Sequence, residues 1–289
     1  MNILLTGATG MIGTALQDAL ADHQLWCLVR RDPAAGEIRH GTAIRSVEDI
    51  DGQIDAVINL AGENIGARRW SRARKQALRD SRIAFTRDLI QALEQAGQSP
   101  QVWINASAVG YYGDRPGEVI SEDTPPGDDF AASLCMDWER AAAANPATRT
   151  VIFRLGVVLG EGGVLGKMLL PFRCGLGVVM GPGGQYMPWV AIEDVCQVIR
   201  QALEDGRFSG PINLVAPQAV SQREFSSALA HAVRRPLLFR LPTPIVRLLM
   251  GEMSMLLLAD QRVDPKRLTS LGFHFQEPKI SDALEQAVS

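Results

Sequence analysis

The chain has 289 residues, of which 46% are hydrophobic and 21% charged, with a formal net charge of -3 and a pI of about 5.9. This composition excludes a disordered or fibrous protein and suffices for one large globular domain, or a large and a small one. The negative charge argues against general nucleic-acid binding, since such domains usually carry a net basic face. No apolar run approaches the roughly 20 residues of a membrane span, and no basic segment precedes the N-terminal apolar run. We therefore predict a cytoplasmic protein with no nucleic-acid and no membrane partner.

The spacing of cysteines and histidines predicts neither a metal site nor a disulfide framework. The four cysteines are far apart, form no C-x-x-C pair, and do not cluster with the four histidines.

The chain begins with a short apolar strand, residues 3–5, and glycines follow where a helix from about Met11 to Ala21 begins. In this spacing the first glycine permits a tight turn, the second lets the backbone approach a pyrophosphate, and the third allows close helix packing. The phosphates then bind at the positive end of the helix. The predicted cofactor contacts are Gly7, Thr9, Gly10, Met11, Ile12 and Gly13. A turn that needs glycine only for its geometry is the alternative.

The second predicted strand, about Leu25 to Val29, ends in Arg30 and Arg31. NAD enzymes usually carry an Asp or Glu at this point to bind the ribose 2′-hydroxyl, and here no acid occurs before Asp32. Two guanidinium groups instead suit a 2′-phosphate, which arginine binds through paired charge-assisted hydrogen bonds. We therefore predict NADP(H) as the cofactor, with an ordinary solvated basic pair as the alternative.

Further along the chain, strands alternate with helices. Continuous apolar runs predict buried parallel strands, and apolar residues with a period near 3.6 predict helices. In chain order these are a strand within 56–62, a helix over 71–96, a strand over 102–106, a helix over 131–144, a strand over 150–155, an apolar helical segment around 165–172, a helix over 193–204, a strand over 212–215, a helix over 221–232 and short helices from 242. Ser221 with Glu224 predicts a capping box, and Asp194 predicts an N-cap.

The alternation predicts an α/β fold, a Rossmann-type doubly wound parallel sheet with a smaller C-terminal substrate and helical region. The predicted parts are an NADP-binding Rossmann domain over 1–155, to which 190–215 returns, a substrate-binding region over 156–241, and a helical C-terminal extension over 242–289.

The predicted substrate-binding region is rich in glycine between 160 and 184. Lys167, Gln185 and Trp189 lie within or beside this stretch, which would suit an anionic, nucleotide-like ligand on whose base or sugar a tryptophan stacks. A packed core with solvated charges is the alternative. Arg154, near the end of a predicted strand, would either orient substrate or close the strand end in an ion pair.

Longer motifs extend over nearly the whole chain. They are TGxxGxxG at 6–13, LAGENI at 60–65, GYYG at 110–113, WE at 138–139, GKMLxPF at 166–172, QYxxW at 185–189 and QRVxPxRL at 261–268. This set resembles the extended short-chain dehydrogenases/reductases, and more closely the YfcH-type NAD(P)-dependent epimerase-family proteins with a C-terminal domain of unknown function. The resemblance implies chemistry related to that of nucleotide-sugar epimerases.

The usual acid/base pair of that superfamily is missing. In its active members a tyrosine acts as acid/base, and a lysine four residues later lowers its pKa from the same helix face. None of the three tyrosines here is followed four residues later by a lysine. Alignment with the family of the segment that precedes Trp138 and Glu139 places Phe130 at the tyrosine's position and Leu134 at the lysine's.

Ser107, Tyr111 and Tyr112 are candidates to replace that pair. A further candidate is Cys135 with Glu139, one helical turn apart on the next helix, for which a core cysteine is the alternative. Ser107 follows the strand over 102–106, where the family hydroxyl binds a substrate oxygen; a loop or capping role is the alternative. The two tyrosines would supply a phenol, but a phenol with a pKa of about 10 is a poor base at neutral pH. Simple packing is their alternative role.

The implied fold adds cofactor contacts beyond the glycine motif. Leu60, Ala61 and Gly62 would flank the adenosine or ribose, and the Val158 backbone would touch the nicotinamide. Arg82, on the helix over 71–96, is a further candidate, with a solvated helix arginine as the alternative.

Together these features predict an NADP-dependent oxidoreductase or epimerase-like enzyme that transfers hydride to or from an unidentified small polar substrate, such as a nucleotide sugar. The alternative is a catalytically silent NADP(H)-binding redox sensor or regulatory protein, which the missing pair favours. The sequence leaves the oligomeric state open between monomer and homodimer.

Overall fold

A parallel sheet of seven strands forms the centre of the computed structural model, which describes residues 1–145 and 147–288. The strand order is β11-β7-β5-β4-β1-β2-β3, and every pairing in it is parallel. The strands are β1 (Asn2–Thr6), β2 (Gln24–Leu28), β3 (Thr42–Ile44), β4 (Ala56–Asn59), β5 (Val102–Ala108), β7 (Arg149–Leu155) and β11 (Gly210–Leu214). The chain builds outward from β1 to β3 and then from β4 to β11, so the order reverses between β1 and β4. The predicted Rossmann-type doubly wound fold is confirmed.

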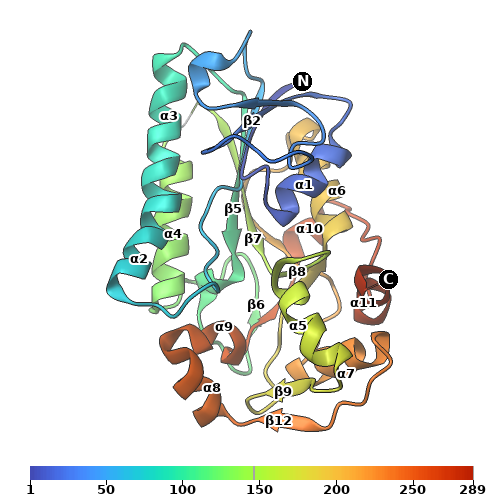
Figure 1. Cartoon of the computed structure of the whole chain (residues 1–289). Coiled ribbons are helices and arrows are strands. Elements are labelled where there is room, and N and C mark those ends of the chain that lie inside the picture. Colours follow the sequence, from blue (N-terminus) through green and yellow to red (C-terminus); the bar gives the residue numbers. More distant parts are fainter. Residues whose placement is uncertain (146, 289) are drawn as a thin grey trace.

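Helices cover both faces of this sheet (Figure 1). Helices α1 (Met11–Ala19) and α6 (Ile192–Glu204) pack against each other on one face. On the other face lie α2 (Arg72–Arg79), α3 (Phe85–Gln95) and α4 (Phe130–Ala142). Strand residues such as Ile3, Leu4 and Leu5 are therefore buried from both sides, which explains the continuous apolar runs.

The segment predicted as one helix over 71–96 is two α-helices joined by a π-helical turn, η2 (Asp80–Ala84). Helices α2 and α3 run end to end in Figure 1. A π turn holds an extra residue, so the side chains that follow it are rotated around the helix axis relative to those before it. Arg82 lies within this turn.

The remaining elements form a smaller part beyond the carboxyl ends of the strands. It contains the two-stranded pairs β8 (Val157–Leu159) with β10 (Trp189–Ala191), β9 (Val178–Met180) with β12 (Phe239–Leu241), and β6 (Val119–Ile120) with β13 (Arg262–Val263). Its helices are α5 (Gly163–Arg173), α7 (Gln222–Ala232), α8 (Thr243–Met250), α9 (Met255–Leu258) and α11 (Ile280–Val288). Helix α10 (Lys266–Ser270) instead packs against β11 of the central sheet, where Leu268 is buried in the core. Between these segments, α6 and β11 belong to the central sheet layers.

One of the two predicted helix caps is confirmed and the other is wrong. The capping box of α7 is present, because Ser221 and Glu224 each accept a backbone N–H at the helix start. The N-cap prediction for Asp194 is wrong: α6 begins after Ala191, and the buried Asp194 carboxylate accepts the backbone N–H groups of Gln276 and Glu277. Asp194 thus ties the C-terminal segment to α6. Within the described residues, no helix is long and apolar enough to cross a membrane.

Candidate functional site

The loops after β1 and β4 touch at the point where the strand order reverses. A Cβ at Gly7 would lie 2.9 Å from the Leu60 carbonyl carbon and oxygen, and Gly7 has a φ of +68°. A Cβ at Gly13 would lie 2.2 Å from the Gly7 oxygen. These two glycines are needed for the close approach of the β1 loop to the Leu60–Gly62 segment and to α1. In doubly wound folds this reversal is where ligands bind.

The N-terminus of α1 is open to a ligand. Its N-cap is Gly10, which has no side chain to cap the helix, and the first turn has no acidic residue. By contrast, Ser221 caps α7 and Asp129 caps α4. The first N–H groups of α1 and the helix dipole therefore suit a phosphate, as the glycine motif predicts.

Arg30 and Arg31 follow β2 and are both exposed. The Arg31 guanidinium donates to Glu37 at 2.7 Å and to the Asp32 carbonyl at 3.0 Å. Because this ion pair is exposed, it holds Arg31 only weakly. Arg30 carries the more available charge at this strand end.

A buried polar network that sequence reasoning missed lies beneath the site. Thr6 Oγ1 donates to Asn59 at 2.7 Å and accepts the backbone N–H groups of Leu60 and Ala61. The Asn59 amide in turn donates to Thr86 and to Asn105. These bonds connect β1, β4, β5 and α3, so they fix the position of the loop from Leu60 onward.

Ser107 belongs to a buried ionic cluster. Its hydroxyl donates to Glu139 Oε1 at 2.7 Å, and the same carboxylate is bound by Arg154 through two hydrogen bonds of 2.9 and 2.8 Å. Both residues of this ion pair are buried. Burial opposes the charge on Arg154, but the bonds and charge of Glu139 outweigh that effect and raise the pKa of Arg154. This geometry favours the ion-pair alternative for Arg154; a direct substrate role stays a prediction.

The two candidate tyrosines occupy different environments. Tyr112 is fully buried, donates to Asn213 at 2.6 Å and accepts from Arg154 at 3.0 Å. Burial raises the pKa of Tyr112 to about 12, although Arg154 opposes that rise. Such a phenol stays protonated at neutral pH and suits a positioning role better than that of a base. Tyr111 is partly exposed, and the Arg154 guanidinium lies 3.4 Å from its ring centre.

The face of α4 that meets Ser107 carries Cys135 and Glu139. Burial raises the pKa of the Cys135 thiol to about 11, although its hydrogen bonds with Ser107 and with the Ala108 backbone oppose that rise. Phe130 points elsewhere and packs edge-on against Trp70 at 5.0 Å. The expected placement of Phe130 and Leu134 at the catalytic positions therefore does not match the face of the helix that borders Ser107.

Arg82 lies between the β4 loop and α4. Its guanidinium donates to the Glu63 carbonyl at 3.0 Å, packs against Gly62, and lies 5.2 Å from the Trp138 ring. Glu63 pairs with Arg74 instead, and burial lowers the pKa of Arg82. A sheltered cation beside the loop of the candidate cofactor site suits an anionic group.

Helix α5 lies against the start of α1 and the β4 loop. A Cβ at Gly163 would lie 2.9 Å from the Met11 sulfur, and Lys167 Nζ is 3.5 Å from the Gly66 carbonyl. Val158, on β8, packs on the hydrophobic cluster of the central sheet. These contacts bring Met11, Val158 and Lys167 to the same side of the molecule as the β4 loop.

Gln185 and Trp189 lie in the interior. Trp189 is 1% exposed and donates to the Gln218 carbonyl, while Gln185 donates to the Met180 and Leu257 carbonyls. Their burial favours the packing alternative, and ligand stacking by Trp189 stays a prediction without an exposed ring to support it.

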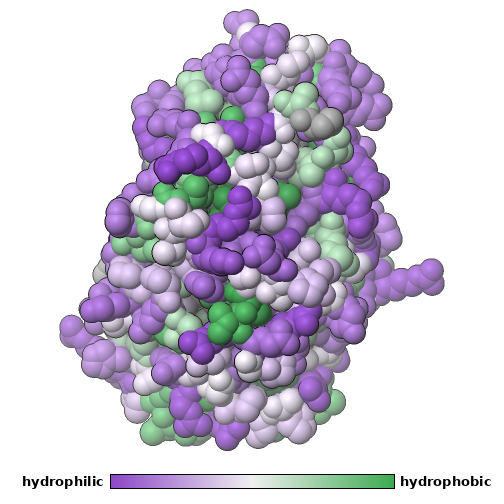
Figure 2. Space-filling view, turned by 180° about the vertical axis from the view of Figure 1, so that it is seen from behind, coloured by the Kyte–Doolittle hydropathy of each residue, from purple (hydrophilic) through white to green (hydrophobic). Residues whose placement is uncertain are grey.

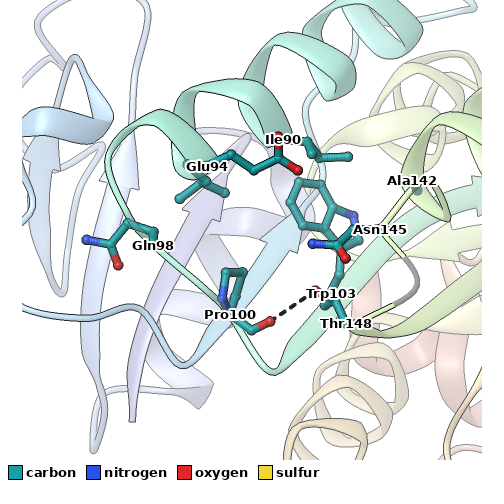
Figure 3. Close-up of a pocket in the computed structure, with 9 residues that line it drawn as sticks. Ile90, Glu94, Gln98, Pro100, Trp103, Ala142, Asn145 and Thr148 are labelled. Atoms are coloured by element: carbon teal, nitrogen blue, oxygen red, sulfur yellow. Dashed lines mark hydrogen bonds between the residues drawn. The ribbon is translucent and has the colours of Figure 1, made fainter.

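A small cavity lies away from this site, near the amino ends of β5 and β7 (Figure 3). It measures about 20 Å³, and a hydrogen bond from Thr148 to the Pro100 carbonyl crosses its edge. Its size suits about one water molecule, so it is not a cofactor site.

The comparisons with known proteins agree with this geometry. Residues 3–214 match the model of the NAD dependent epimerase/dehydratase family, and residues 241–287 match a domain of unknown function, DUF1731. An epimerase family protein of Mycobacterium bovis is 42% identical over 99% of this chain and 97% of its own. The crystal structure of human epimerase family protein SDR39U1 (isoform 2) with NADPH is 35% identical, with a TM-score of 0.91 over 99% of each chain.

A second solved structure is that of a nucleoside-diphosphate sugar epimerase from Corynebacterium glutamicum. It is 30% identical with a TM-score of 0.79, and the match covers 100% of this chain and 58% of that one. Because the family model covers well over half of the residues, the chain belongs to the NAD dependent epimerase/dehydratase family.

Proposed function

We propose that the protein is an NADP(H)-dependent oxidoreductase or epimerase-like enzyme that acts on a small polar substrate of the nucleotide-sugar type. The observation that carries this proposal is the uncapped N-terminus of α1, which follows the β1 loop where that loop packs against the β4 loop and the strand order reverses. When bound, the nicotinamide supplies or accepts a hydride. The solved NADPH complex of a 35% identical relative supports the choice of cofactor.

The residues proposed to hold the cofactor are those of the glycine motif, the Leu60–Gly62 segment, Arg82 and the Val158 backbone, with Arg30 and Arg31 on the 2′-phosphate. Ser107, held by Glu139, is the proposed contact to the reacting oxygen of the substrate. Tyr111 and Tyr112 are proposed to lie beside it, because both contact Arg154, which shares the Glu139 carboxylate with Ser107. Lys167 would contribute positive charge beside the β4 loop. Three buried residues would affect substrate binding indirectly, by holding the surrounding residues in place: Arg154, Gln185 and Trp189.

Replacing both Arg30 and Arg31 by Ala tests the cofactor. NADPH affinity should fall about tenfold or more, because two phosphate contacts are lost, while NADH affinity stays within about twofold. Fluorescence titration of both nucleotides measures this. Arg207→Ala, which removes an exposed arginine paired locally with Asp205, is the control. An equal loss for both nucleotides would contradict the NADP(H) assignment.

A catalytically silent NADP(H) sensor is the second candidate, because no Tyr-x-x-x-Lys pair exists and the Ser107 and Tyr112 hydroxyls both donate to internal partners. Native mass spectrometry of the freshly purified protein distinguishes the two. A second polar ligand retained with NADP(H) supports the enzyme and defines a substrate for assay. Ser107→Ala should then abolish turnover of that substrate and leave NADPH affinity unchanged; NADP(H) alone, with no turnover of nucleotide sugars, supports the sensor.

A further inference from the structure

Two segments that lie together in the smaller part of the molecule contain no acidic residue. They are residues 162–192 and 225–251, which we call the acid-free lobe. The lobe carries six positive charges, namely Lys167, Arg173, Arg234, Arg235, Arg240 and Arg247. Since the whole chain has a net charge of -3, the rest of the molecule carries -9. The two segments are therefore positively charged, whereas the rest of the chain is negatively charged.

The same lobe holds most of the exposed apolar side chains. Eleven large hydrophobic residues of the described chain are exposed, and eight of them lie in the lobe. They are Val164, Leu170, Leu176, Leu238, Phe239, Ile245, Leu248 and Leu249. Leu238 and Leu170 are each 71% exposed and Leu248 is 75% exposed, which is unusual for leucine in a folded domain.

The two segments meet at one end of the molecule. Strands β9 and β12 pair, with Val178 opposite Phe239, and Arg235 Nε donates to the Arg173 carbonyl at 2.9 Å. Helix α8 follows β12 directly and turns Ile245, Leu248 and Leu249 outward from one face. In Figure 1, β9, β12, α7 and α8 lie together at the lower end, and green apolar residues are also visible among purple ones on the lower part of Figure 2.

We propose that the acid-free lobe docks on an anionic lipid surface. Exposed leucines and a phenylalanine lie beside arginines here, and the nearby acids are on the flanking residues and on α11, which packs against α7. This is the composition that inserts apolar side chains at the headgroup level while basic groups contact anionic lipids. A second copy of the chain fits poorly, because a two-fold contact through this lobe would bring six positive charges against the same six. The prediction of no membrane partner rested on the lack of a spanning run and of a basic N-terminal segment, and the contact proposed here needs neither.

Co-sedimentation of the full chain with vesicles tests the proposal. Vesicles of phosphatidylcholine with about one third phosphatidylglycerol should bind the protein, pure phosphatidylcholine should bind it much less, and added salt should weaken binding. Leu248→Ser with Leu249→Ser should reduce binding about tenfold or more, and Arg247→Glu about fivefold or more. Val119→Ser, an exposed apolar residue outside the lobe, is the matched control and should change nothing.

Thermal melting and light scattering of each variant complete the test. Unchanged melting temperatures with reduced vesicle binding support the lipid contact. Equal binding of all variants, or no preference for anionic vesicles, would overturn it. A dimer that dissociates in the Leu248 and Leu249 variant, without vesicle binding by the parent chain, would also overturn it and assign the lobe to a second copy.

Discussion

Arg154 and Arg82 are both sheltered arginines near the candidate site, and they differ in their partners. Arg154 is 3% exposed and shares two hydrogen bonds with the Glu139 carboxylate. Arg82 bonds to backbone carbonyls and a serine, and no carboxylate of the described chain pairs with it. A buried charge with a built-in counter-ion is held by the fold, whereas a half-buried charge without a counter-ion, as at Arg82, is available to a ligand. Changing each arginine or its partner tests this contrast.

Breaking the Arg154 pair should give the largest effect. Glu139→Gln leaves Arg154 buried without a counter-charge, and the free energy of unfolding should fall by about 3–5 kcal/mol. Chemical denaturation measures the loss. Asp205→Asn, which breaks the exposed pair with Arg207, should cost less than about 1 kcal/mol. A loss for Glu139→Gln as small as this control's would mean that the buried pair does not hold β7 and α4 together.

The effect of Tyr112→Phe on stability at different pH values tests the network around Arg154 further, because Tyr112 accepts a hydrogen bond from Arg154. At neutral pH the substitution should cost about 1–3 kcal/mol, because it removes a buried hydrogen-bond partner of Arg154 and Asn213. The tyrosine pKa is raised from 10.0 to about 12, so its contribution is fully present below pH 10. Above pH 10 the unfolded chain loses this proton first, and stability falls.

The gap between parent and variant should therefore narrow by about 1.4 kcal/mol per pH unit above pH 10. Denaturation curves of both proteins between pH 8 and pH 11 measure the gap. A gap that stays constant over this range would show that Tyr112 does not titrate as a buried phenol.

Arg82→Met should have the smallest effect on stability and a clear effect on binding. The free energy of unfolding should change by less than about 1 kcal/mol, because an apolar side chain replaces a desolvated cation that has no carboxylate partner. NADPH affinity should fall about tenfold, as fluorescence titration would show. Arg87→Met, an exposed arginine on α3, controls for loss of helix charge. A large stability loss with unchanged affinity would reverse the assignment of Arg82.

The sequence predicted the sheet well because its strands are buried on both faces and their apolar runs are continuous. It missed β3, since three residues from Thr42 to Ile44 are too short to produce a pattern. The π turn at Asp80–Ala84 was also missed, because the helical periodicity continues across it. Boundary errors elsewhere were a residue or two, as at Leu28 for β2 and Gln95 for α3.

The candidate site divides in the same way. The glycine motif was readable because its spacing is local. Glu139 lies 32 residues from Ser107, and Thr86 lies 27 from Asn59, so only the folded chain shows that they are partners. Trp189 is a different case: an aromatic residue beside glycines predicts a ligand contact, and the sequence does not show that the pairing of β10 with β8 encloses its ring.

The bond from Ser107 to Glu139 also limits what the serine can do for a ligand. A serine hydroxyl has one proton, and an ionised carboxylate bound to arginine accepts but cannot return one. Because the Ser107 hydroxyl already donates its hydrogen bond to Glu139, its oxygen can only accept a hydrogen bond from a bound molecule. A ligand atom placed against it must therefore bring its own proton, so this arrangement favours an alcohol over a ketone at that position.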